Sequence, residues 1–196
     1  MKVSSLPSTK SLIITLITIL SCIPSTAQTK TRFDKFKNAT HFMTNETQTS
    51  GVTFDGGKSA SLLIHRMGMI VGFTCEGQVD GCTPKAVELL FMGYTSDWEM
   101  KDGHGVNLLI DGKPETAGTA DWDGQVLEAD NLVEYNDTNI SLELLKKLAA
   151  AKKVDVQIGL FEFSLTDANL AAIRDIAGHA GSIPHAVTSL SPVIPN

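Results

Sequence analysis

The chain of 196 residues lacks the motifs by which most enzymes are identified from sequence. It has no Gly-x-Ser-x-Gly nucleophile elbow, no His-Glu-x-x-His pair, no complete Gly-x-x-x-x-Gly-Lys-Ser/Thr phosphate-binding loop and no dinucleotide fingerprint. Catalytic triads and carboxylate pairs are defined in space rather than in sequence, so an enzyme of that kind stays open. Predictions of fold and function therefore rest on residue patterns alone.

Positive charge is in the minority. The chain has 16 Lys and Arg against 22 Asp and Glu, a net charge of −6 that becomes −8 once residues 1–27, with Lys2 and Lys10, are removed. Nucleic acid and anionic lipid repel a chain with this overall charge, so we expect neither nucleic acid nor an anionic lipid surface as a partner. A protein or a small ligand, cations included, remains as the expected partner.

Long apolar runs are absent except near the start. Residues 1–10 are basic, residues 12–23 are mostly apolar, and the small residues Ser25 and Ala27 precede Gln28. This layout predicts a signal peptide over 1–27, cleaved before Gln28, because the apolar run is shorter than the about 20 residues that span a bilayer. We expect a secreted or periplasmic protein with no transmembrane anchor after cleavage.

Cysteines are few, three in all. Cys22 lies in the predicted leader, where a loose lipobox makes a lipoprotein anchored at Cys22 the alternative address. Cys75 and Cys82 remain in the mature chain, and an even count in an oxidising compartment predicts a disulfide between them. Two free buried thiols are the alternative, whereas a metal site lacks nearby His or Cys residues to complete it.

The rest of the chain divides by pattern into three parts. Residues 28–50 form a polar lead-in with at most one edge strand, residues 51–178 a single β-rich domain, and residues 179–196 a flexible tail rich in Pro and Ser. Apolar residues alternate over 63–75 and 87–91, and Asp-Gly pairs recur between short runs. Such alternation with frequent turns is typical of antiparallel β-structure.

Helical periodicity is confined to two segments near the C-terminus. Residues 141–153 and 167–177 each follow a hydroxyl N-cap, Ser141 or Thr166, with an apolar residue before the cap and a leucine four residues after it. We predict an α+β fold: a mostly antiparallel β-sandwich of about eight strands with two short C-terminal helices.

Two loop clusters hold the polar and aromatic residues best suited to a site. Carboxylates with a histidine suit a divalent cation, and tryptophan rings suit a flat ligand. The candidate cation ligands are Asp97, Glu99, Asp102, Asp121 and Asp123, and the candidate ligand-binding residues are Trp98, His104 and Trp122. An even number of strands between the clusters would bring them to the same end of a sandwich. Turn formation is the alternative role for these Asp and Gly residues.

Two functions are compatible with these patterns. The first is an exported, non-catalytic binding or structural domain, with no assigned cofactor and no catalytic residue. The alternative is a small hydrolase that depends on carboxylates or on a carboxylate-bound metal. The first is favoured by analogy, since disulfide-linked β-domains without a catalytic motif commonly bind rather than catalyse.

Overall fold

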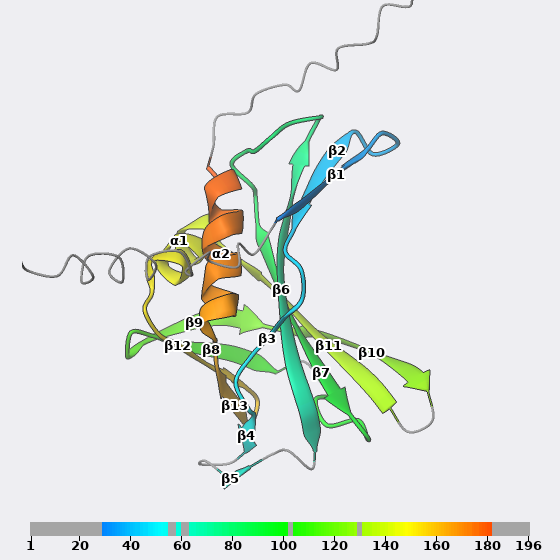
Figure 1. Ribbon diagram of the computed structural model, residues 1–196, viewed down its shortest axis with the longest axis vertical. Coiled ribbons are helices and arrows are strands. Elements are labelled where there is room, and N and C mark those ends of the chain that lie inside the picture. Colours follow the sequence, from blue (N-terminus) through cyan, green and yellow to red (C-terminus); the bar gives the residue numbers. More distant parts are fainter. Residues whose placement is uncertain (1–28, 55–57, 60–62, 102–103, 129–130, 182–196) are drawn as a thin grey trace, which may run out of the picture.

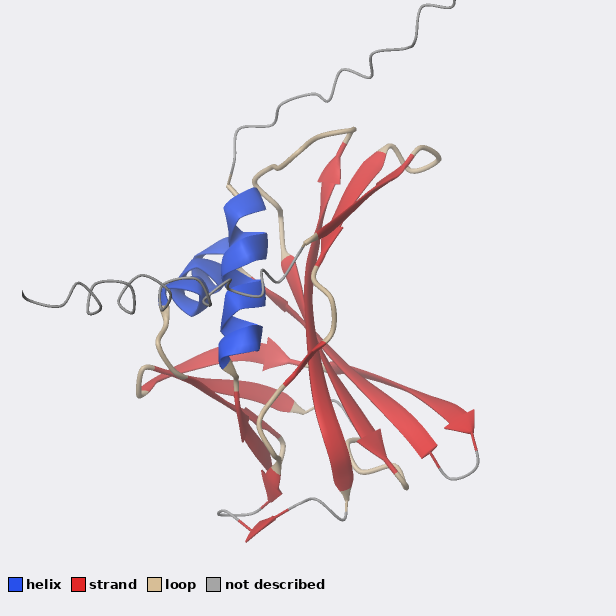
Figure 2. Cartoon of the chain, in the orientation of Figure 1, coloured by secondary structure: helices blue, strands red, loops and turns tan. Residues whose placement is uncertain are grey.

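A computed structural model describes residues 29–54, 58–59, 63–101, 104–128 and 131–181. The predicted signal peptide, Cys22, Asp102 and most of the predicted tail lie outside these residues. The described chain forms two antiparallel sheets and two helices, which confirms the predicted α+β class (Figures 1 and 2).

Sheet A is the longer layer and runs the length of the molecule (Figure 2). All its neighbouring strands are antiparallel, and a short strand, β3 (Thr47–Gln48), adds to β6 beside the main path. Its strand order is β1 (Lys30–Asp34), β2 (Ala39–Met43), β6 (Ile64–Glu76), β7 (Val87–Thr95), β11 (Asn131–Ile140) and β10 (Asp121–Glu128).

Sheet B covers one part of the inner face of sheet A, and the helices cover another part of it (Figure 1). Its neighbouring strands are antiparallel as well. The order is β5 (Lys58–Ser59), β4 (Thr53–Phe54), β13 (Phe161–Ser164), β12 (Val154–Ile158), β8 (Gly105–Ile110) and β9 (Lys113–Thr119).

The core lies where the inner faces of the two sheets and the helices meet. Alternate residues of β6 and β7, such as Met69, Val71, Leu89 and Phe91, are almost completely buried, because successive strand residues point to opposite faces. The period-two pattern in the sequence thus marks the inner face of sheet A correctly.

Both predicted helices are present. α1 (Leu142–Ala150) begins at Ser141, whose hydroxyl accepts from the Leu144 amide, and α2 (Asp167–His179) begins at Thr166 with a capping box to Asn169. Arg174 of α2 donates to the carbonyls of Ala149 and Ala151 at 3.1 and 2.8 Å. This contact satisfies carbonyls that the end of α1 leaves without helical partners.

The lead-in differs from its prediction. Three strands, β1, β2 and β3, lie within 28–50, where the sequence predicted at most one, and they help to raise the described total to thirteen strands rather than about eight. Polar residues occupy eight of their twelve positions, so little apolar alternation reveals them. β2 and β3 pair instead with the long strand β6, and β1 pairs with β2.

The predicted disulfide is present. Cys75 and Cys82 are bonded, with their Cα atoms 6.0 Å apart. Beyond the bond, the Cys82 amide donates to the His179 carbonyl at 3.2 Å, and the Gly181 amide donates to the Cys82 carbonyl at 2.7 Å. The bridge therefore ties the end of β6 to the C-terminal end of α2. None of the helices in the described part of the chain is long and apolar enough to cross a membrane.

Candidate functional site

The two predicted loop clusters do meet, through their tryptophans. Trp98 follows β7 and Trp122 lies on β10, and their rings pack edge to face with centroids 5.6 Å apart. Two strands, β8 and β9, separate the clusters along the chain, which is the even number that the prediction required. Gly124 makes room for the pair, since a Cβ there would collide with the Trp98 ring.

A buried carboxylate holds this tryptophan pair in place. Glu134 of β11 is fully buried and accepts hydrogen bonds from the amides of Glu99 and Met100 at 2.7 and 2.9 Å. It also accepts one from the Trp122 indole nitrogen at 2.9 Å. Three N–H donors replace the water that a buried carboxylate loses, so Glu134 fixes the β7–β8 loop on sheet A.

The candidate cation ligands are divided between two faces of sheet A. Trp122 points to the inner face, so its strand neighbours Asp121 and Asp123 point to the outer face. Asp97 and Glu99 lie instead in the β7–β8 loop, where burial, Asp97 and Glu134 raise the pKa of Glu99. Among the described residues no three His, Cys, Asp or Glu side chains are grouped to hold a metal ion, and Asp102 lies outside them.

His104 contacts a turn of sheet B. Its ring packs on Gly159 in the β12–β13 turn, where a Cβ would be 3.0 Å from the ring, and its carbonyl accepts from the Ala120 amide at 2.8 Å. Gly159 has a φ of 59°, a conformation that favours glycine. His104 thus contributes to the packing of this turn.

A different feature, an open groove on the outer face of sheet B, has the size of a ligand site. Its volume is about 660 Å³, within the usual range for small-ligand sites of about 300–1,000 Å³. Outward side chains of four adjacent strands line it, among them Asn107 and Leu109 of β8, Pro114 and Thr116 of β9, Asp155 and Gln157 of β12, and Glu162 of β13.

A row of polar side chains crosses the groove from strand to strand. The strand register places Thr116, Asn107, Gln157 and Glu162 side by side. The Asn107 amide donates to the Gln157 carbonyl oxygen at 3.2 Å, and the Gln157 amide donates to a Glu162 carboxylate oxygen at 3.0 Å. Each amide nitrogen carries two hydrogens, so one donor of each remains available beyond this chain of bonds.

A second row beside it is partly apolar. Pro114, Leu109, Asp155 and Ser164 are neighbours across the strands, and Leu109 is 44% exposed although it lies mid-strand. Asp155 is paired with Lys153 at 2.9 Å and accepts from the Ser164 hydroxyl at 2.5 Å. Burial acts to raise the pKa of Asp155, but these two partners outweigh it and lower the pKa, so the carboxyl stays ionised.

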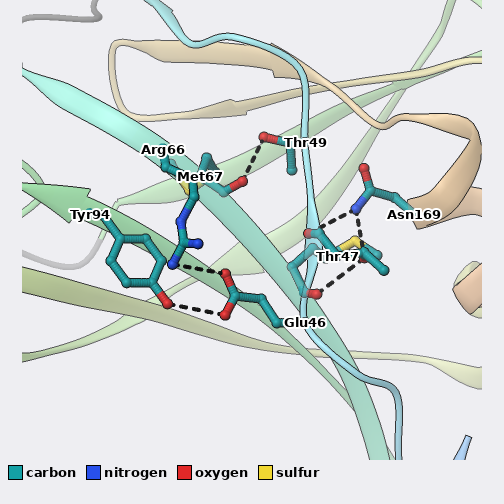
Figure 3. Close-up of polar contacts among 8 residues, drawn as sticks. Glu46, Thr47, Thr49, Arg66, Met67, Tyr94 and Asn169 are labelled. Carbon is teal, nitrogen blue, oxygen red and sulfur yellow. Dashed lines mark hydrogen bonds and ion pairs between the residues drawn. The ribbon is translucent and has the colours of Figure 1, made fainter.

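A third polar cluster, shown in Figure 3, is structural. The Tyr94 hydroxyl donates to Glu46 at 3.0 Å, Arg66 pairs with Glu46 at 3.5 Å, and the Arg66 guanidinium stacks 3.7 Å above the Tyr94 ring centroid. On the next residue, Thr47, the hydroxyl accepts from the Asn169 amide of α2 at 2.7 Å. Residues 46–47 therefore tie sheet A to α2.

The groove was missed in the sequence because its side chains resemble an ordinary solvated strand face. The sequence signal that marks the groove is one outward leucine, Leu109, near the outward amide side chains of Asn107 and Gln157. These residues belong to the alternating segments 105–110 and 154–158. Comparisons with protein-family models, with curated proteins and with solved structures find no match to the chain.

Proposed function

We propose that this chain is an exported, non-catalytic binding domain whose ligand lies in the groove on the outer face of sheet B. The single observation that carries the proposal is the continuous row from Thr116 to Glu162, which offers hydrogen-bond donors and acceptors in alternation beside an apolar strip. Binding sites combine apolar surface with a few placed polar groups in this way.

The chemistry of the groove favours a neutral ligand rich in hydroxyl groups, such as an oligosaccharide. A hydroxyl both donates and accepts, so it complements amide and carboxylate groups placed side by side. Lys153, a cation beside the groove, is already paired with Asp155. Leu109 and Pro114 supply a surface for the C–H face of a sugar ring.

A binding role fits these residues better than the hydrolase alternative. A carboxylate hydrolase needs a general acid whose pKa is raised, and the pKa of Asp155 is lowered. None of the residues that line the groove is a histidine or a cysteine. Asp155 and Glu162, the carboxylates of the two rows, both accept hydrogen bonds from neighbouring side chains.

Export is part of the proposal and rests on two observations. The layout of residues 1–27 favours a cleaved leader, and the Cys75–Cys82 bond suits an oxidising compartment. Mass spectrometry of the mature protein should place Gln28 at its N-terminus. A lipid-modified Cys22 at that position would contradict a freely secreted protein.

Calorimetric titration with a panel of neutral hexasaccharides tests the binding site. We expect at least one member built from glucose, mannose, galactose or N-acetylglucosamine to bind, and Gln157→Ala to weaken it at least about tenfold by breaking the polar row. Gln125→Ala is the matched control, because Gln125 is an exposed glutamine on the outer face of β10. Equal loss in both variants would contradict the groove, and release of shorter sugars would favour the hydrolase.

A further inference from the structure

The first hairpin of sheet A concentrates the positive charge of an otherwise acidic chain. Residues 30–43, called here the basic hairpin, contain four Lys or Arg and one Asp, whereas residues 44–196 contain 10 Lys or Arg and 21 Asp or Glu. Charges beyond about 8 Å are largely screened at physiological ionic strength, so the local charge governs what the hairpin contacts. Its net charge of +3 is opposite in sign to that of the rest of the chain.

The basic hairpin also exposes apolar side chains, one at its tip and one at its base. Phe36 lies in the turn between β1 and β2 and is 89% exposed, flanked by the exposed Lys35 and Lys37. Met43 is 47% exposed and pairs with Lys30 across the outer face of the strands. Figure 1 shows this turn projecting at one end of the molecule, opposite the end that holds β4 and β5.

The turn is held in a fixed conformation that leaves Phe36 pointing outward. One Asp34 carboxylate oxygen accepts from the amides of Phe36 and Lys37 at 2.9 and 3.2 Å, and these bonds lower the pKa of Asp34. Asn38 closes the turn with a φ of 47°. The single acid of the basic hairpin is thus directed at backbone amides rather than at the neighbouring cations.

The cations themselves, Lys30, Arg32, Lys35 and Lys37, form no ion pair within the described part of the chain. The acids near the strands are the exposed Glu76, beside Ala39 in β6, and Asp175 of α2, which accepts from Thr29 at 2.6 Å. The Lys35 ammonium lies 5.0 Å from the Phe36 ring centroid. An aromatic ring with a cation on either side is therefore presented to solvent.

We propose that the basic hairpin docks the protein on an anionic lipid bilayer. Lysine and arginine are attracted to anionic headgroups, and an aromatic or aliphatic side chain enters the boundary between headgroups and acyl chains. Phe36 is the side chain that enters, with Lys35 and Lys37 at headgroup level beside it. This function is separate from the groove of sheet B, which such docking leaves accessible.

Co-sedimentation of the mature chain with vesicles tests the proposal. We expect binding to vesicles of phosphatidylcholine and phosphatidylglycerol, little binding to phosphatidylcholine alone, and a decrease as salt rises. Lys35→Gln with Lys37→Gln should weaken binding about 30-fold, and Phe36→Ser about tenfold. Circular dichroism of each variant checks that the sheets remain folded.

Matched variants elsewhere on the surface separate the hairpin from general charge and hydrophobicity. Leu160→Ser removes an apolar side chain that is 59% exposed in the β12–β13 turn, and Lys146→Gln with Lys152→Gln removes two exposed cations. Both controls should bind as the parent chain does.

Three outcomes would overturn the proposal. The first is no binding of the parent chain to anionic vesicles, and the second is equal weakening by the hairpin variants and their controls. The third is retention on immobilised polyglutamate through Lys35 and Lys37 without vesicle binding, which would assign the basic hairpin to an acidic protein instead.

Discussion

At the scale of single residues, two acidic side chains of β11 affect stability in opposite directions. Glu134 points to the inner face and accepts three N–H donors, whereas Asp137 points to the outer face and lies beside Asp121 of β10. The Asp137 Oδ1 atom is buried and has no hydrogen-bond partner among the described residues. A buried carboxylate stabilises the fold only when hydrogen-bond donors or cations stabilise its ionised form, so of these two only Glu134 should do so.

Glu134→Gln should destabilise the protein by about 2 kcal/mol, because an amide cannot accept from all three donors and a charged hydrogen-bond acceptor is lost. Urea unfolding at pH 7 measures the change. Glu76→Gln is the control, since that side chain is exposed, and its effect should stay within about 0.5 kcal/mol. Similar values for the two variants would show that the carboxylate does not hold the tryptophan loop.

Asp137→Asn should stabilise the protein above neutral pH. Burial first, then Glu88 and Asp121, raise the pKa of Asp137 from 3.8 to about 6. The folded state therefore binds the proton more tightly than the unfolded state, and stability falls as pH rises through about 6. After allowance for solvent screening, the expected gain is about 1 kcal/mol at pH 8.

The gain from Asp137→Asn should fall to a small fraction at pH 4, where the folded state of the parent chain is protonated and its unfolded state only partly ionised. Melting temperatures of the two proteins at pH 4 and pH 8 test this dependence. A gain of the same size at both pH values would attribute the effect to the amide rather than to the removed charge.

At the scale of elements, the disulfide links the end of β6 to Cys82 in the loop that follows it, and the backbone of Cys82 contacts the segment after α2. It closes a loop after β6, and Cys82 also pairs with Ala180 just beyond the helix. The chain-entropy model gives about 2.5 kcal/mol for a loop of this length, so reduction should lower the free energy of unfolding by about that amount. Urea unfolding of the oxidised and reduced forms of the same chain measures the difference. Equal unfolding free energies for the two forms would show that the bridge does not stabilise the fold.

The elements that the sequence predicted best are those with one dominant local signal. Alternation marks β6 and β7, and hydroxyl caps with leucines mark α1 and α2. β1 and β2 lack such a signal, because Thr40 interrupts the inward face of β2 and the apolar Met43 points outward, and β2 depends on pairing with β6. Local pattern predicts an element well only where that element buries its own apolar face.

At the scale of the whole molecule, the candidate sites depended on which faces the topology brings together. The parity of strands between the two loop clusters favoured the same end of the sandwich for both, and Trp98 and Trp122 do meet. It did not predict that Asp121 and Asp123 point to the opposite face, since their strand β10 was expected to be a turn. The groove arises only when β8, β9, β12 and β13 pair, and distant residues such as Asn107 and Glu162 then belong to one row.

The distribution of charge is also a property of the whole molecule. The net charge of −6 predicts repulsion from anionic surfaces, yet the basic hairpin places positive charge at one projecting end. Net charge describes the average field of the protein, whereas contact is governed by the nearest few side chains. The groove and the basic hairpin are consequently two independent surfaces of one domain.

A heteronuclear NMR titration of the side-chain N–H groups with the neutral hexasaccharides decides whether the groove of sheet B is the binding site. We expect the side-chain amide signals of Asn107 and Gln157 to shift together and saturate. The amide signal of Gln125 and the indole signals of Trp98 and Trp122 should stay in place. Shifts of the indole signals without movement of the groove amides, or no shift with any of these sugars, would contradict binding in the groove.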